Sequence, residues 1–149
     1  MDFHSADDLK RAVGEHLGFS GWVSIDQARI DQFAEATGDH QWIHVDPVRA
    51  ADGPFGSTIA HGYLTLAITN QMLPELMNVP TAAMGVNYGA NKVRFPAPVP
   101  VDSRVRMGCV IIEVTDVSGG VQVVTRNTVD VEGSDKPACV VEAVSRFSF

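Results

Sequence analysis

The order of the elements along the chain predicts an α+β protein, with helices in the first half and strands in the second. Up to about residue 77 the apolar residues recur at helical spacing. Beyond residue 84 they alternate with polar residues, and β-branched types become common. Such a chain buries its apolar surface when a helical layer packs against an antiparallel sheet. At 149 residues we expect a single domain, spanning residues 1–149.

Capping residues predict short helices in the first third of the chain. Ser5 is a good N-cap, and apolar residues at every fourth position predict an amphipathic helix up to Gly18. Residues 22–25 are expected to be extended. Asp26 caps a second helix that ends at Gly38, and Asp46 followed by proline caps a third, short helix.

Residues 60–77 form the longest helical run and are apolar almost all round. We therefore expect a central, buried helix with a bend at Pro74. Strands follow at residues 84–95, 104–115, 121–131 and 138–149. The last three are joined by tight connections and should form an antiparallel meander, whereas prolines at 96, 98 and 100 interrupt the first strand pair. A curved sheet wrapped around the helix would bury both.

Charge and cysteine usage exclude several classes of protein. A net charge of −7 would repel a phosphate backbone, so we expect no nucleic-acid partner. Cys109 and Cys139 lie in apolar, alternating stretches and read as free thiols in a reducing compartment. The N-terminus lacks the pattern of a signal peptide, and no apolar run is long enough to span a membrane. We expect a cytoplasmic protein.

The stretch 38–46 combines acids and histidines with apolar residues, a mixture that is costly to bury without partners. Asp39 and His44 are five residues apart, which suits a loop better than one helix face. They could hold a water molecule for general acid/base chemistry. Alternatively, Asp39 is a helix cap and His44 is satisfied by the backbone.

A metal site is the competing interpretation of the same stretch. His40 and His44 are four residues apart, and Asp46 or His61 could supply a third ligand. The chain has no HExxH frame, and Asp46 is better explained as a helix cap. We therefore expect no metal.

Further polar and glycine positions could take part in binding. Gly62 opens the central helix, where free N–H groups could bind a carbonyl oxygen that becomes negative, or where helix and sheet pack closely. Asn70 needs a hydrogen-bond partner in a buried helix, and could orient the dyad or cap a strand end. Four basic residues alternate along two strands and could bind a nucleotide phosphate or form a solvated sheet face: Lys92, Arg94, Arg104 and Arg106.

Three segments, residues 36–46, 59–64 and 87–95, resemble the MaoC-like dehydratases, or (R)-specific enoyl-CoA hydratases. Their order and spacing match, so the resemblance extends from about residue 33 to the C-terminus. The commoner form of the family has Asn-Pro where this chain has Gln41-Trp42. This difference brings the chain nearer a subgroup that includes nodulation-protein-N-like members.

The resemblance implies a hot dog fold and a homodimer with acyl-CoA tunnels near the subunit interface. It also implies that Asp39 and His44 are catalytic and that Gly62 N–H binds the thioester carbonyl. The implied reaction is reversible syn addition of water to a trans-2-enoyl-CoA, with Asn70, Lys92 and Arg94 as candidate substrate contacts. The coenzyme A thioester is then the substrate, and no cofactor is needed. An acyl-CoA thioesterase and a non-catalytic acyl-CoA-binding module are the alternatives.

Overall fold

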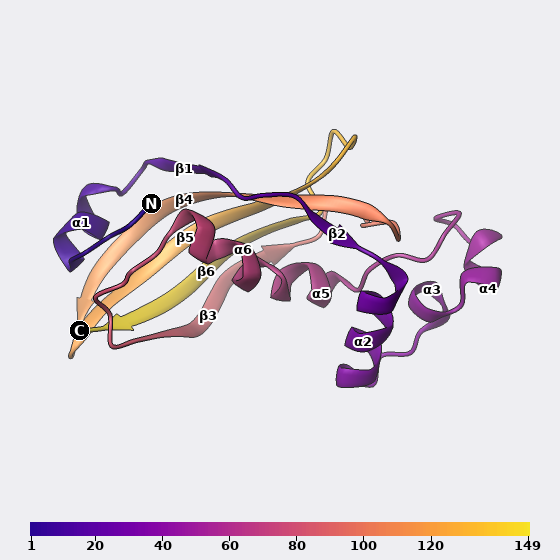
Figure 1. Ribbon diagram of the computed structural model, residues 1–149, viewed down its shortest axis with the longest axis horizontal. Helices are drawn as coiled ribbons and strands as arrows, with labels where there is room; N and C mark the ends of the chain where they lie inside the picture. The colour runs from indigo at the N-terminus through magenta and orange to yellow at the C-terminus, as the bar shows by residue number, and fades with distance from the viewer.

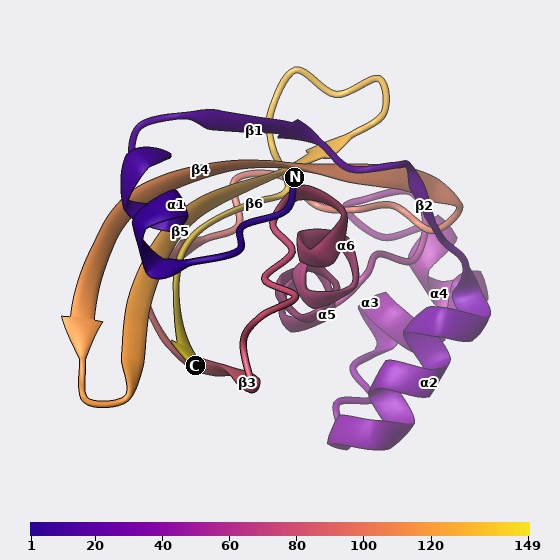
Figure 2. The same cartoon turned by 60° about the vertical axis from the view of Figure 1, so that its left-hand side comes forward.

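The computed structural model describes residues 1–149 and consists of short helices around one curved antiparallel sheet (Figures 1 and 2). The helices are α1 (Ala6–Arg11), α2 (Gln27–Thr37), α3 (Trp42–Val45), α4 (Pro47–Ala51), α5 (Gly62–Ala67) and α6 (Thr69–Leu76). The strands are β1 (His16–Phe19), β2 (Val23–Ile25), β3 (Met84–Arg94), β4 (Ser103–Val117), β5 (Gly120–Val131) and β6 (Cys139–Ser148). The α+β prediction is confirmed.

The sheet has the order β1-β4-β5-β6-β3, and β2 also pairs with β4. All pairings are antiparallel, and the predicted meander of the last three strands is confirmed. Strand β3 does not pair with β4; it pairs with β6, at the opposite side of the sheet from β1. The proline-rich segment 96–100 carries the chain from that edge back to β4.

The concave side of the sheet encloses α5 and α6, which Figure 2 shows nearly end-on inside the curve. Met72 of α6 is completely buried in the same apolar cluster as Met107 and Ile111 of β4. The helix is thus packed into the sheet, as predicted. In both views α2, α3 and α4 gather at one end of this assembly.

The central helix is divided at Ile68 and not at Pro74, which lies inside α6. At the division the Thr69 hydroxyl donates to the Leu66 carbonyl over 2.7 Å, and Gln71 N–H donates to Ile68 over 3.0 Å. Side-chain and i to i−3 bonds of this kind replace the regular helical pattern. The predicted position of the bend was therefore wrong.

One side of α5 and α6 is exposed in the single chain, although the sequence predicts a helix buried all round. Tyr63, Ala67 and Asn70 lie on that side, and Tyr63 is 71% exposed. The sheet covers the opposite side. The expectation that Asn70 lies in a buried helix was therefore wrong.

The first helix ends at Arg11, so the prediction that it continues to Gly18 was wrong. Gly14 adopts a φ of 89°, which favours glycine, and its N–H donates to the Ile111 carbonyl over 2.8 Å. The chain is thereby fixed to β4, and Leu17 is buried as part of strand β1. Of the three apolar residues at that spacing, Leu9 is buried on α1, Val13 is exposed, and Leu17 is buried on β1.

Both cysteines are free and buried, as predicted. Burial raises the pKa of the Cys109 thiol to about 12 and that of Cys139 to about 11. A thiolate is the reactive form, so neither side chain is a nucleophile near neutral pH. No helix in the structure is long and apolar enough to cross a membrane.

We predict that Met72→Ala lowers the free energy of unfolding by about 2–5 kcal/mol, because it leaves a cavity between α6 and the sheet. Urea denaturation followed by circular dichroism measures the change. The matched control is Val48→Ala, at a side chain that is 84% exposed, and should leave stability nearly unchanged. Equal losses in the two variants would contradict this view of the core.

Candidate active site

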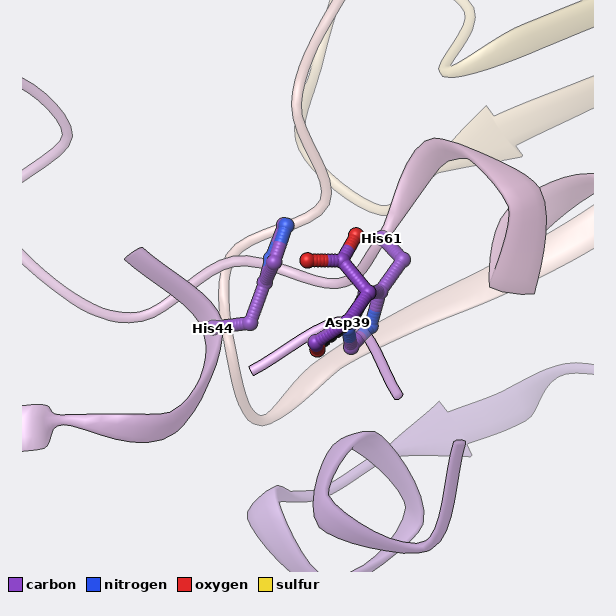
Figure 3. Close-up of side chains that lie close together, drawn as sticks. All are labelled: Asp39, His44 and His61. Atoms are coloured by element: carbon purple, nitrogen blue, oxygen red, sulfur yellow. Dashed lines mark hydrogen bonds between the residues drawn. The ribbon is translucent and has the colours of Figure 1, made fainter. Parts of the chain in front are cut away.

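Three separate segments bring Asp39, His44 and His61 together at the end of the sheet (Figure 3). Asp39 follows α2, His44 lies on α3, and His61 is the N-cap of α5. One nitrogen or oxygen atom from each side chain lies within 4.8 Å of the other two. Both histidines are buried, whereas Asp39 is exposed to solvent. The cluster is thus buried on one side and open to small molecules on the other.

The His44 ring is held by the main chain of the segment before α5. His44 Nδ1 lies 2.7 Å from the Ile59 carbonyl oxygen, and Ile59 N–H donates back to Ile43 over 3.0 Å. A carbonyl only accepts, so the hydrogen is on Nδ1 and a neutral His44 keeps a lone pair on Nε2. Nε2 is therefore the atom that can exchange a proton with water or substrate.

Burial is the main cause that lowers the pKa of His44. The neighbouring His61 lowers it further, while the hydrogen bond to the Ile59 carbonyl and the Asp39 carboxylate oppose the shift. The neutral imidazole is consequently favoured at neutral pH. A neutral ring can act as a general base.

The turn after α2 fixes the position of Asp39. Gly38 ends α2 with a φ of 77°, and its N–H donates to Ala34 over 2.8 Å. Gln41 N–H donates to Asp39 Oδ1 over 3.3 Å. The carboxylate therefore faces the His44 ring with an oxygen still available. The structure brings the predicted pair together, and its catalytic role stays a prediction.

By distance alone, Asp39, His44 and His61 are the residues that could hold a metal ion. However, the two imidazole rings are stacked, with centroids 3.9 Å apart and planes inclined by 23°. Because the two ring planes are nearly parallel, their in-plane lone pairs do not converge on one point. This arrangement suits proton transfer better than tetrahedral ligation.

His40 and Asp46, the other residues of the metal alternative, lie outside the cluster. His40 is exposed and lies 3.7 Å from Glu35. The Asp46 carboxylate accepts from Arg49 N–H over 3.0 Å, so its predicted role as a helix cap is confirmed.

Gly62 follows His61 directly, and its N–H donates to no acceptor within the chain. It lines a hollow of about 260 Å³ together with Phe55 and Phe95. A Cβ at this position would lie 3.2 Å from the Phe95 ring, which is tight. Both sequence interpretations therefore apply to Gly62, since it packs closely and also presents a free donor.

The remaining candidate contacts lie on other surfaces. Asn70 lines a hollow of about 430 Å³ with Tyr63 and Tyr88, between the central helices and β3. Lys92 and Arg94 are exposed on β3 and have no acidic side chain at ion-pair distance. None of these three side chains is hydrogen-bonded to Asp39 or His44.

Arg104 and Arg106 are engaged on the solvated face of β4. Arg104 forms an ion pair with Glu132, and Arg106 lies 3.7 Å from Asp130. Both guanidinium groups also lie over the Trp22 ring. The solvated-face interpretation fits these two arginines.

The sequence analysis missed the supporting contacts of Gln27 and Trp42. Gln27 Nε2 donates to the His44 carbonyl over 2.8 Å, and its Oε1 accepts from the Thr58 hydroxyl over 2.6 Å. Trp42 carries the Arg49 guanidinium 4.4 Å above its ring and so joins α3 to α4. No spacing pattern identifies such long-range contacts. The sequence showed Trp42 only as part of the Gln41-Trp42 departure from the commoner family pattern.

The architecture is that of the hot dog fold. An (R)-hydratase from A. caviae involved in PHA biosynthesis superposes with a TM-score of 0.70 and 22% identity, over 89% of this chain and 94% of that chain. A family model described as "MaoC like domain" matches residues 8–133. The chain belongs to this MaoC-like dehydratase family, a family of hydratases and dehydratases, as the resemblance implied.

Curated relatives from mycobacteria and rhizobia match nearly the whole chain. The 3-hydroxyacyl-thioester dehydratase Z of Mycobacterium tuberculosis (strain ATCC 25618 / H37Rv) is 54% identical over 146 residues, which cover 97% of each protein. Nodulation protein N of Rhizobium leguminosarum bv. viciae is 41% identical over 97% of this chain and 92% of that protein. The likeness to nodulation protein N agrees with the subgroup indicated by Gln41-Trp42.

We predict that stability depends on pH through His44. Its lowered pKa means that the unfolded chain takes up the proton first as the pH falls below about 6.5. The stabilising contribution of the neutral ring is therefore complete above that pH and is lost as the pH falls through the folded-state pKa. Between about pH 7.5 and pH 5, the wild type should lose more free energy of unfolding than His44→Gln. Urea titrations at both pH values measure this, and equal losses would contradict it.

Proposed function

We propose that the protein is an (R)-specific enoyl-CoA hydratase, which adds water reversibly to a trans-2-enoyl-CoA and yields an (R)-3-hydroxyacyl-CoA. The observation that carries the proposal is the free Nε2 of a buried, neutral His44 beside the Asp39 carboxylate. In a family of hydratases and dehydratases, such a pair is suited to activate water. We also propose the cytoplasm as its compartment, because both cysteines are free thiols.

In the hydration direction, water hydrogen-bonds to the Asp39 carboxylate and to His44 Nε2. As the water oxygen adds to Cβ, its proton passes to Nε2, and the π electrons move to the thioester as an enolate. The imidazolium then returns a proton from Nε2 to Cα on the same face, which gives syn addition and restores neutral His44. Asp39 holds the water and stabilises the transient imidazolium.

The negative charge that develops on the thioester oxygen requires a hydrogen-bond donor close to that oxygen. Gly62 N–H is free, lies at the N-terminus of α5 and follows His61 in sequence. A preorganised N–H aimed at a developing oxyanion contributes strongly to lowering a barrier. We therefore assign Gly62 to the thioester carbonyl.

For the rest of the substrate, we keep Lys92 and Arg94 as contacts for the phosphates of coenzyme A. Both are exposed and free of acidic partners, in contrast to Arg104 and Arg106. Asn70 is a candidate polar contact at the hollow beside β3. No cofactor is required, because the coenzyme A thioester itself provides the activated carbonyl.

We propose a homodimer because β3 is an open edge. It pairs with β6 on one side only and is exposed along almost its whole length. Met84, Val86 and Tyr88 are large apolar side chains exposed on this strand. A long unprotected edge of this kind favours pairing with another chain.

The dimer is tested by light scattering, which should give twice the chain mass. Val86→Lys places a charge on the open edge and should weaken association, while the exposed Val48→Lys on α4 serves as the matched control. A monomeric wild type at micromolar concentration would contradict the proposed homodimer.

The activity is tested by following loss of the conjugated thioester absorbance of a trans-2-enoyl-CoA. Asp39→Asn and His44→Gln should each lower kcat by about 10²–10⁴-fold, because each removes a group that contacts the reacting water. His40→Gln is the control, since His40 lies outside the cluster. Equal turnover in the wild type and both site variants would overturn the dyad.

Product analysis separates the alternatives. Chiral chromatography should give the (R)-3-hydroxyacyl-CoA from a short and a long enoyl-CoA, with different rates if the acyl site selects length. Release of free coenzyme A thiol from a saturated acyl-CoA would indicate a thioesterase. Tight binding with no turnover would indicate a non-catalytic module, and either result would replace the proposed function.

A further inference from the structure

His61 makes contacts that the proposed mechanism has not used. Its side chain is 3% exposed, and its Nε2 lies 2.9 Å from the main-chain oxygen of Asp39. One ring face stacks on His44, and the ring also lies 4.9 Å from the Phe33 ring of α2. His61 therefore contacts the loop that carries Asp39, helix α3 that carries His44, and helix α2.

The hydrogen bonds show which ring nitrogen of His61 carries a hydrogen. A carbonyl oxygen only accepts, so Nε2 carries the hydrogen and donates it to Asp39. His61 Nδ1 is buried and has no hydrogen-bond partner. In the neutral ring this is the Nε2–H tautomer, the opposite of the tautomer of His44.

The backbone of His61 belongs to the site as well. Its carbonyl accepts from Thr65 N–H over 3.1 Å and so starts α5. The next residue is Gly62, whose N–H is assigned to the thioester carbonyl. Through its side chain and its main chain, His61 joins the segment that carries Asp39 to the segment that carries Gly62.

We propose that His61 is a positioning residue, which holds Asp39 and His44 in register with the Gly62 N–H without itself transferring a proton. This inference rests on the proposed hydratase function. The hydrogen bond to Asp39 fixes the distance between the water-holding pair and the carbonyl-binding donor. The stacked ring limits rotation of His44 about its own axis, so Nε2 stays directed at the water.

A histidine that only fills space would behave differently on substitution. His61→Phe keeps the aromatic ring that stacks on His44 but removes the donor to Asp39. His61→Gln loses the ring but keeps an N–H group the same number of bonds from Cα. If the hydrogen bond matters, glutamine is the better replacement, whereas a space-filling role favours phenylalanine.

We expect His61→Phe to lower kcat by about 10–100-fold with a much smaller change in KM, because a misplaced acid/base pair affects the transition state more than binding. His61→Gln should recover a large part of that loss. His40→Gln, in the same loop but outside the cluster, should leave both constants unchanged. Equal kinetics for His61→Phe and His61→Gln, or full activity in His61→Phe, would overturn the proposal.

Two measurements distinguish this inference from failure of the hydratase function, and the first needs no variant. Long-range ¹H–¹⁵N spectra of the wild type should show His61 as the Nε2–H tautomer and His44 as the Nδ1–H tautomer. Main-chain amides of residues 39–41 should also exchange faster in His61→Phe than in His61→Gln. Opposite tautomers or equal exchange would overturn the positioning role, whereas a wild type without hydratase activity overturns only the proposed function.

Discussion

The hydrogen bond from His44 Nδ1 to the Ile59 carbonyl is the interaction on which the site depends. It decides which imidazole nitrogen carries the hydrogen, and burial then keeps that ring neutral. The same Ile59 residue bonds to Ile43 through its N–H, so α3 and the segment before α5 form one unit. Without this contact, neither the direction of Nε2 nor its distance from Asp39 would be defined.

The sheet provides the rigid support for this unit. Ile59 bridges to Pro100 just before β4, and Ala60 N–H donates to Val99 over 2.8 Å. The site segment is therefore attached to the strand that pairs with β1, β2 and β5. The division at Ile68 places His61 and Gly62 at the start of α5, whereas Met72 and Leu76 of α6 are buried in the core together with Leu64 of α5.

Two histidines with opposite tautomers lie face to face in the cluster, and each donates to a different backbone carbonyl. Main-chain carbonyl oxygens thus determine which ring nitrogen carries the hydrogen in each histidine. Gln27 adds a further link between α2, α3 and the Thr58 region. Asp39 and His44 are thereby held beside each other by contacts among segments that are distant in sequence.

The sequence alone determined what depends on local chemistry: the caps at Ser5, Asp26 and Asp46, the end of α2 at Gly38, and the alternation of the long strands. It also singled out Asp39, His44 and Gly62 as candidate site residues, because they lie within short, recognisable motifs. Tertiary structure decided the end of α1, the division at Ile68 and the exposure of Asn70. It also decided the tautomers and the contacts of His61 and Gln27, because these follow from long-range hydrogen bonds that no local pattern encodes.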